Sequence, residues 1–308
     1  MDFFYSERVA KLFTAVSAIV VILLVAILLV TGTVLYGVLS PDTSGTALDP
    51  HILLGNPRAI SVSGPGMPPR DAVFFPGQIG GPTIILAHGY RSHASALLTL
   101  VAAFQDNNYN VVVFDFSGHG GAKGTTTLGY KETRELLAVV DAVAQRDDVD
   151  KERIGVWGTG MGAYAAVAAA SQDSRIRAFA ADSLYDSPLD ALRMELQRGG
   201  PGNLPVIRTL CRWGFKLINF SYRNEAPLSR RLPAMTGTAK LFIQGRDNPA
   251  LADSTLALFL TAAEPRQQMV APKSDFSTMT DEEKRVYEKE VVGFFLQNIP
   301  PVFKPRTP

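Results

Sequence analysis

The sequence predicts an α/β fold with a doubly wound, mostly parallel sheet, preceded by one transmembrane helix. Short apolar runs without polar alternation recur along the chain, and most are followed by a stretch of helical character. Runs buried on both faces are typical of parallel strands covered by helices. Repeated strand–helix units give a doubly wound domain. The third observation is an uncharged apolar run near the N-terminus that is long enough to cross a bilayer.

The elements follow in order along the chain of 308 residues. We expect strands at 59–63, 72–75, 83–87, 111–114, 154–157, 178–181, 240–244 and 267–271. We expect helices at 94–107, 131–145, 161–171, 251–263 and 281–298. Gly-Pro and Pro-Pro breakers separate the first two strands.

The N-terminal apolar run has no charged residue from Leu12 to Leu39. A spanning helix needs about 20 apolar residues, so residues 12–39 are expected to contact the lipid bilayer as an anchor behind a short tail, 1–11. A cleaved signal peptide is the alternative. Its apolar region has roughly 7–15 residues and ends at a small-x-small site, whereas this run is longer and lacks a convincing site.

Orientation is predicted from the basic residues on either side of this run. Arg8 and Lys11 lie before it, and no Lys or Arg follows until Arg58. Because basic residues favour the cytoplasmic side, we expect a single-pass protein with a cytoplasmic N-terminus and an extracytoplasmic large domain.

The remaining chain is expected to form a linker (40–58), one α/β domain (59–299) with a cap-like insertion (187–232), and a tail (300–308). Lys and Arg together number 30 and Asp and Glu 29, a net charge of +1 that does not suggest nucleic acid as a partner. The single cysteine, Cys211, cannot form an internal disulfide. No C-x-x-C pair, H-E-x-x-H or phosphate-loop pattern is present, so we expect no metal and no cofactor.

Four motifs lie at the ends of expected strands. They read His88-Gly89-Tyr90, Asp115-Phe116-Ser117-Gly118-His119-Gly120, Gly158-Thr159-Gly160-Met161-Gly162 and Gln244-Gly245-Arg246-Asp247-Asn248. In this order they resemble the α/β-hydrolase superfamily, in particular its bacterial serine aminopeptidase-like branch. That branch has an HGY-type oxyanion turn, a DFRGHG-type loop, a GxSMG elbow and an HGxxD acid loop. The resemblance covers roughly residues 59–298 and implies an esterase or peptidase if the chain is active.

The elbow motif lacks its nucleophile. The pattern is small-x-nucleophile-x-small, because neighbouring strands and the following helix crowd the turn. Gly158 and Gly162 occupy the small positions, so Gly160 is at the nucleophile position. Making Thr159 the nucleophile instead would place Trp157 and Met161 where small residues are needed.

The histidine of the triad is also missing. In this fold the chain order is serine, acid, histidine, but all four histidines precede the elbow; they are His51, His88, His93 and His119. Ser274 or a neighbour occupies the place of the base. The acid position falls on Asn248 by motif spacing, with Asp247 one residue earlier as the alternative. We therefore interpret the triad as degenerate, with vestigial positions Gly160, Asp247, Asn248 and Ser274.

Backbone groups of the site need no particular side chain. We expect His88, Gly89, Tyr90 and Met161 to line a vestigial oxyanion pocket, and the helix N-terminus at the elbow favours anions. Arg246 and Lys273 are candidate contacts to a small anionic ligand such as a carboxylate. The alternative is that both are solvated loop charges.

Two other catalytic interpretations remain open. His88 or His119 could serve as a general base in a rearranged site, although both belong to loops in which such histidines are ordinary. Ser183, after an expected strand, could be a relocated nucleophile.

The insertion is apolar and basic. It contains Leu204, Val206, Trp213, Leu217, Phe220, Arg208, Arg212 and Lys216 among others. It could be a cap over the site, or it could pack against the membrane surface or a partner.

The leading hypothesis is a membrane-anchored pseudoenzyme with a binding or scaffold role toward a small anionic ligand or a protein partner. The alternative is an active hydrolase of ester or amide bonds with a non-standard site. A third class, a purely structural membrane partner, is favoured if the elbow pocket is filled.

Overall fold

The computed structural model describes residues 2–41, 56–64 and 67–301, which divide into two compact units. One unit comprises Met1–Leu39 and Leu192–Arg223, and the other comprises Ser40–Ala191 and Asn224–Pro308. Most of the expected linker and most of the expected C-terminal tail lie outside the described residues.

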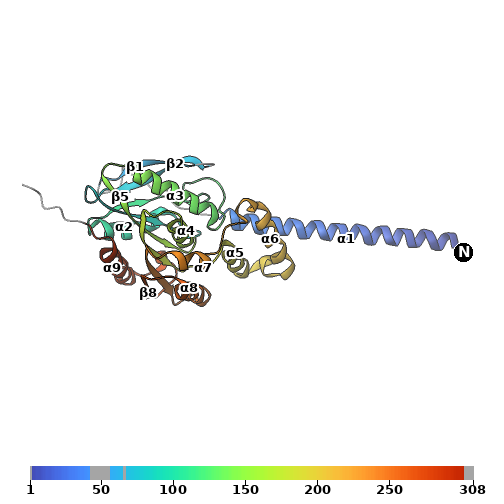
Figure 1. The fold of residues 1–308 in the computed structure, drawn as a ribbon. Helices are drawn as coiled ribbons and strands as arrows, with labels where there is room; N and C mark the ends of the chain where they lie inside the picture. The colour runs from blue at the N-terminus through green and yellow to red at the C-terminus, as the bar shows by residue number, and fades with distance from the viewer. Residues whose placement is uncertain (1, 42–55, 65–66, 302–308) are drawn as a thin grey trace, which may run out of the picture. The chain divides into compact units, whose positions relative to one another are not determined.

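The second unit contains the predicted sheet, with eight strands in the order β1-β2-β4-β3-β5-β6-β7-β8 (Figure 1). Pairing from β4 through β3 to β8 is parallel, and β1–β2 and β2–β4 are antiparallel. The mostly parallel doubly wound sheet is therefore confirmed. The strands are β1 (Arg58–Gly64), β2 (Met67–Phe75), β3 (Gly81–Ala87), β4 (Asn110–Val113), β5 (Val149–Thr159), β6 (Ile176–Asp182), β7 (Ala239–Gly245) and β8 (Arg266–Ala271).

Helices cover both faces of this sheet (Figure 1). On one face, α2 (Leu98–Gln105), which continues the 3-10 turn η2 (Ala94–Leu97), packs beside α9 (Asp281–Asn298). On the other face, α3 (Tyr130–Ala144) and α4 (Met161–Ala170) pack together. There α8 (Pro249–Thr261) also packs against β7, with the Phe259 ring 5.8 Å from that of Phe242.

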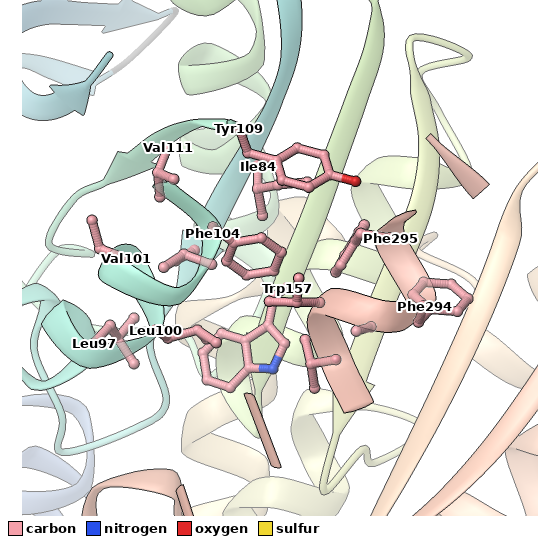
Figure 2. Close-up of a cluster of buried hydrophobic side chains, with 14 of the residues drawn as sticks. Ile84, Leu97, Leu100, Val101, Phe104, Tyr109, Val111, Trp157, Phe294 and Phe295 are labelled. Atoms are coloured by element: carbon pink, nitrogen blue, oxygen red, sulfur yellow. The ribbon is translucent and has the colours of Figure 1, made fainter. Parts of the chain in front are cut away.

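The core explains why the apolar runs form central strands. All seven residues of β3 are buried, as expected for a strand covered on both faces. Beside it, Phe104 of α2 packs edge-on against Phe295 of α9, with ring centroids 5.4 Å apart (Figure 2). Trp157 of β5 is fully buried and donates its indole N–H to the Tyr287 hydroxyl at 2.9 Å, so its polar atom is satisfied inside the core.

The first unit is built on α1 (Asp2–Leu39). Within it, Val9–Leu39 has 31 residues and contains an 18-residue stretch with a mean hydropathy of 3.1, so its length and composition suffice to cross a membrane. The helix begins before the uncharged run, so the described part of the expected tail 1–11 is helical.

The insertion between β6 and β7 is divided between the two units. It contains α5 (Pro188–Gln197), η3 (Gly200–Asn203), α6 (Pro205–Ile218), η4 (Phe220–Tyr222), α7 (Leu228–Arg231) and η5 (Leu232–Ala234). The domain 59–299 with its insertion 187–232 stays a prediction; in the structure, Leu192–Arg223 of this insertion groups with α1. The reason is helix packing, since α6 contacts α1 closely. Only α7, η5 and the ends of the insertion belong with the sheet.

Candidate functional site

The four sequence motifs meet at one edge of the sheet. His88 follows β3, Asp115 follows β4, Gly160 follows β5 and Asp247 follows β7. These strands are parallel, so their carboxyl ends lie at the same edge, where open α/β sheets carry their ligand sites.

Gly160 forms the sharp turn between β5 and α4. It is the N-cap residue of α4, with φ +52° and ψ −108°. A non-glycine residue rarely adopts such a backbone, and its strain costs about 1–3 kcal/mol. The turn is fixed by backbone bonds, since the Gly160 amide donates to the Asp182 carbonyl at 2.8 Å and its carbonyl accepts from the Tyr164 amide at 2.9 Å. The conformation is that of a strained strand-to-helix elbow.

Gly158 and Gly162 are glycines for steric reasons. A Cβ atom on Gly158 would lie 2.4 Å from the carbonyl carbon of Gly162, and one on Gly162 would lie 2.1 Å from the Ala87 oxygen. A Cβ on Gly160 would meet nothing within 4 Å. The three glycines therefore differ: two are required by close backbone approach, and the central one faces open space.

The loops after β7 and β8 are joined beside this edge. The Asp247 carboxylate accepts a hydrogen bond from the Ser274 amide at 2.6 Å. Asn248 instead caps α8, and its side chain accepts from the Leu251 amide at 3.3 Å. Of the two candidates for the acid position, Asp247 is thus the one that faces the loop holding Ser274.

Asp182, at the end of β6, forms a buried network that the sequence did not single out. Its carboxylate accepts from the Tyr287 hydroxyl at 2.7 Å and from the Ser183 hydroxyl at 2.9 Å. Complete burial raises the pKa of Asp182 to about 7; the two hydrogen bonds oppose this, and the nearby carboxylates of Asp275 and Asp247 add to it. Ser183 is itself buried, and its hydroxyl also lies 3.1 Å from the Ser274 carbonyl. This placement favours a structural role for Ser183 over that of a nucleophile.

His88 is engaged on both ring nitrogens. Nδ1 lies 2.8 Å from the Gly89 carbonyl, and Nε2 accepts from the Phe116 amide at 3.0 Å. Because Nδ1 faces a carbonyl oxygen and Nε2 faces an amide N–H, we assign a neutral ring that is protonated at Nδ1. Burial, followed by the neighbouring His119, lowers the pKa of His88 to about 3. The geometry favours a ring that ties two loops together over a general base.

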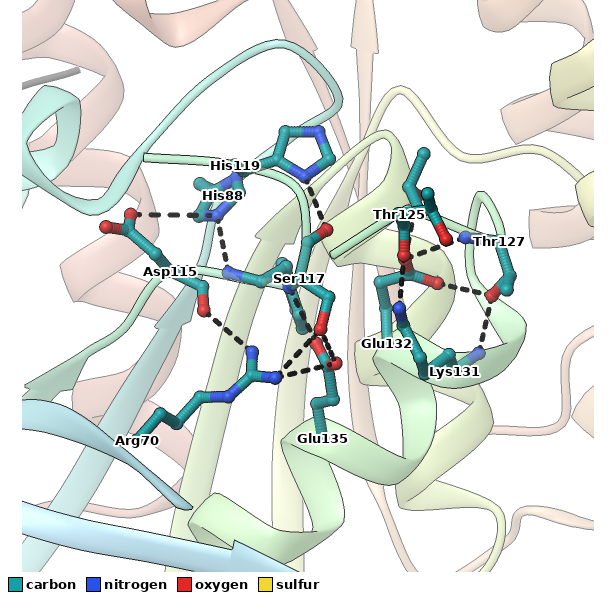
Figure 3. Close-up of polar contacts among 12 residues, drawn as sticks. Arg70, His88, Asp115, Ser117, His119, Thr125, Thr127, Lys131, Glu132 and Glu135 are labelled. Carbon is teal, nitrogen blue, oxygen red and sulfur yellow. Dashed lines mark hydrogen bonds and ion pairs between the residues drawn. The ribbon is translucent and has the colours of Figure 1, made fainter. Parts of the chain in front are cut away.

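His119 lies beside His88, with ring centroids 5.2 Å apart (Figure 3). Its Nδ1 lies 3.1 Å from the Ser117 carbonyl, while its buried Nε2 has no hydrogen-bond partner among the described residues. Burial is the main cause that lowers the pKa of His119. His93 packs locally, with Nδ1 2.5 Å from the Ser95 hydroxyl, and His51 lies outside the described residues.

The expected oxyanion groups lie around the elbow. A Cβ on Gly89 would lie 3.3 Å from the carbonyl oxygen of Thr159, so the His88-Gly89-Tyr90 turn passes against the end of β5. The Tyr90 ring stacks edge-on against His119 at 5.9 Å. Met161 begins α4, where the first backbone N–H groups have no partner within the helix.

The two candidate anion contacts differ in their surroundings. The Lys273 ammonium donates to the Thr278 carbonyl and lies 3.9 Å from the Glu283 carboxylate. It therefore contacts the loop after β8 and the first turn of α9. Arg246 is exposed. The carboxylates of Asp247 and Asp275 both lie close enough to Asp182 to raise its pKa. An anion held by both cations stays a prediction, and this arrangement favours the alternative of solvated loop charges.

The comparisons with known proteins agree with this geometry. The sequence profile of the alpha/beta hydrolase family matches residues 84–291, more than half of the chain. The chain belongs to the α/β hydrolase family. This assignment confirms the superfamily resemblance and covers all four motifs.

Relatives of this α/β hydrolase family member include uncharacterized proteins of Escherichia coli. The chain is 32% identical over 104 residues to a 31.7 kDa protein of the traX-finO intergenic region of Escherichia coli, a match that covers 33% of this chain and 36% of that protein. It is 26% identical to YfhR of E. coli O157:H7 over 71% of this chain and 72% of YfhR. The fold is similar to that of the Pyrococcus furiosus esterase Pf2001, with a TM-score of 0.67, 21% identity, and coverage of 84% of this chain and 99% of that one.

Two buried glutamates of α3 support the loops of this α/β hydrolase fold, and the sequence reasoning missed both (Figure 3). Glu132 accepts from the Gly129 amide at 2.8 Å and from the Thr127 amide at 3.0 Å. Glu135 accepts from the Ser117 amide at 3.0 Å and from Arg70 at 3.1 Å. A glutamate three residues into a helix is a signal of capping, so Glu132 could have been found. Arg70 and Glu135 are too far apart in sequence for any pattern to link them.

No cluster of three or more metal-ligating side chains occurs in the part of the chain that the structure describes. The groups that the structure places at the site are backbone amides, Gly160 at the elbow and the carboxyl groups of Asp182 and Asp247.

Proposed function

We propose that this protein is a membrane-anchored member of the α/β hydrolase family that does not hydrolyse esters or amides and acts by binding. The observation that carries the proposal is Gly160 at the elbow. The backbone there has the conformation in which the fold presents its nucleophile, yet the residue has no side chain.

The register of the elbow supports this assignment. Shifting the nucleophile position to Thr159 would move the small positions away from Gly158 and Gly162, where only glycine fits. Since no Oγ or Sγ atom is available at residue 160, no acyl-enzyme can form there.

The absence of a base supports the same conclusion. His88 has both nitrogens bonded to backbone groups, and burial lowers the pKa values of His88 and His119. A neutral ring that is already engaged is poorly suited to accept a proton from a nucleophile. An acid such as Asp247 has no imidazole to orient.

Open space above Gly160 supports binding over a purely structural role. A side chain added there would meet no atom within 4 Å, so the position is not filled by neighbouring residues. A group the size of a methyl could therefore lie at residue 160 without displacing protein atoms.

Membrane anchoring by α1 completes the proposal. The span Val9–Leu39 exceeds the roughly 20 residues needed to cross a bilayer. We propose a cytoplasmic N-terminus and an extracytoplasmic large domain, because Arg8 and Lys11 lie on the N-terminal side.

Fluorophosphonate labelling of the full chain in detergent tests the proposal. The native chain, the Gly160→Ser variant and a known serine hydrolase are labelled in parallel, and ester and aminopeptide substrates are assayed with the same samples. We expect neither labelling nor turnover by the native chain, whereas the known hydrolase reacts. Specific labelling, or turnover lost on heat denaturation, would establish an active site elsewhere and refute the proposal.

A further inference from the structure

We propose that α6 and η4 form a second membrane contact, lying in the lipid–water interface beside the C-terminal end of α1. This inference rests on the proposed anchoring by α1. The partner is the surface of a phospholipid bilayer containing anionic headgroups, and the contact is monotopic: it enters the interface without crossing the membrane.

The packing of α6 on α1 is the first observation. The Cys211 thiol of α6 lies 3.7 Å from the Thr31 carbonyl of α1. A Cβ on Gly214 would lie 2.9 Å from a methyl carbon of Leu35, so glycine allows the helices to approach closely there. A glycine inside a helix is unfavourable relative to alanine, and close packing on α1 accounts for its presence.

The position along α1 at which α6 packs determines how deep α6 lies in the membrane. Residues of α1 from Val9 to Val30 are exposed, with Ile27 half-buried, and the first buried residue is Thr31. At 1.5 Å per residue, the exposed stretch from Leu12 to Val30 rises about 28 Å, close to the ~30 Å thickness of the hydrocarbon core. If this stretch spans the core, α6 packs on α1 where the helix enters the headgroup region.

The side chains of α6 form three distinct faces. Ile207, Cys211 and Phe215 are buried. A second face, about 140° away around the helix, is apolar but exposed: Trp213 is 70% exposed and Leu217 76%. The third face is basic, with Arg208, Arg212 and Lys216 spaced four residues apart. The buried face already meets the protein, so the exposed apolar face is free to contact the bilayer.

The composition of the surrounding chain fits an interface. Between Gly199 and Arg223 there is no acidic residue. Lys216 lies 5.9 Å from the centroid of the Trp213 ring, and Arg223 lies 4.4 Å from that of Phe220. Basic residues beside aromatic and aliphatic ones are typical of helices that lie in the membrane interface. The exposed apolar residues of this surface are Leu204, Val206, Trp213, Leu217, Ile218 and Phe220.

Continuity with α1 favours the bilayer over other partners. The exposed residues of α6 belong to the same compact unit as the apolar exposed length of α1. Tyr36, 69% exposed near the end of α1, is an aromatic residue of the kind enriched at membrane interfaces. A bilayer that covers α1 therefore extends to the place where α6 packs.

Tryptophan quenching by brominated lipids tests the depth of α6. The chain has two tryptophans, Trp157 and Trp213, and Trp157 is fully buried in the other unit. The full chain and its Trp213→Phe variant are reconstituted in vesicles of phosphatidylcholine and phosphatidylglycerol. The phosphatidylcholine carries bromine either near the glycerol or near the methyl end of the acyl chain. The difference between the two proteins gives the Trp213 signal.

We expect blue-shifted Trp213 emission and loss of most of it with bromine near the glycerol, with less loss for deeper bromine. Trp213 emission that persists in brominated vesicles and is quenched by aqueous iodide would overturn the proposal. So would a blue shift without lipid quenching in a chain that is dimeric in detergent, because a second copy would then cover the surface.

Alkaline carbonate extraction separates the two proposals. If the chain is released from membranes, α1 is not an anchor and the proposed function fails in that respect. If the chain resists extraction while Trp213 remains in water, only the interfacial contact of α6 is refuted.

Discussion

The Asp247 carboxylate and the Ser274 amide are 2.6 Å apart, joined by a hydrogen bond between the loops that follow β7 and β8. In an active α/β hydrolase the acid and the histidine follow the nucleophile in this chain order. The loop in which the family carries its base is thus held against Asp247, which we propose as the vestigial acid.

This relationship predicts that hydrolysis can be restored by two substitutions. In Gly160→Ser/Ser274→His we expect the new imidazole to meet Asp247 and activate the serine, which the open space at residue 160 accommodates. A general base contributes about 10²–10⁴-fold, so p-nitrophenyl acetate turnover should exceed that of Gly160→Ser by about 10²-fold. The matched control is Gly160→Ser/Ser274→Ala. Equal rates for the two folded double variants would show that residue 274 is not the base position.

Gly160 and Gly162 of the elbow predict two different losses of stability on substitution by alanine. Gly162→Ala places a Cβ 2.1 Å from the Ala87 oxygen, and since backbone atoms must move we expect a loss of more than about 4 kcal/mol in the free energy of unfolding. Gly160→Ala has room, so only its positive φ is penalised, by about 1–3 kcal/mol. Thermal unfolding of the full chain in detergent measures both.

Gly293→Ala is the control for this series. Gly293 lies inside α9, where an added Cβ would meet nothing within 4 Å and the backbone φ is not positive. Alanine there should stabilise the protein by about 0.5–1 kcal/mol. A Gly162→Ala variant as stable as Gly160→Ala would contradict the steric explanation of the elbow.

The sheet was predictable because the apolar composition of each central strand can be read from the local sequence. Every residue of β3 is buried, which accounts for the apolar run Ile84–Ala87. The helix α9 begins at the predicted residue, where Thr280 and Glu283 form a capping box. Motif spacing likewise placed Gly160 on the turn between β5 and α4.

Long-range contacts were not predictable in the same way. The bond between Arg70 and Glu135 joins residues far apart in sequence, and the Trp157–Tyr287–Asp182 chain links two strands to α9. The grouping of α6 with α1 depends on Cys211 and Gly214, whose partners lie more than a hundred residues away. No local pattern contains such pairings.

The raised pKa of Asp182 predicts a pH dependence of stability. Its folded-state pKa is about 7 against an ordinary value of 3.8, so the folded protein holds a proton that the unfolded chain releases. Between pH 4 and 7 this contribution falls as pH rises, by up to roughly 4 kcal/mol. The Asp182→Asn variant lacks this titration, because an amide accepts from Tyr287 without ionising.

We therefore expect the stability of Asp182→Asn, relative to the native chain, to increase from pH 4.5 to pH 7.5. His88, with its pKa lowered to about 3, acts in the opposite direction but is present in both proteins and cancels in the difference. Unfolding midpoints measured across this range in one detergent give the comparison. A difference that is independent of pH would mean that Asp182 is already ionised in the folded protein.

The buried pair of Arg70 and Glu135 gives the last prediction. Burial is the main cause that raises the pKa of Glu135, and Arg70 opposes it. In Arg70→Met the carboxylate loses its counter-charge while remaining buried, so we expect a loss of about 3–5 kcal/mol in the free energy of unfolding at pH 7.5. At pH 5 the loss should be smaller, because Glu135 can be protonated. Glu135→Gln in the Arg70→Met background should recover part of the stability at pH 7.5, because it removes the uncompensated charge and keeps an acceptor for the Ser117 amide. Equal losses at both pH values, with no recovery in the double variant, would show that Arg70 acts through packing and not through its charge.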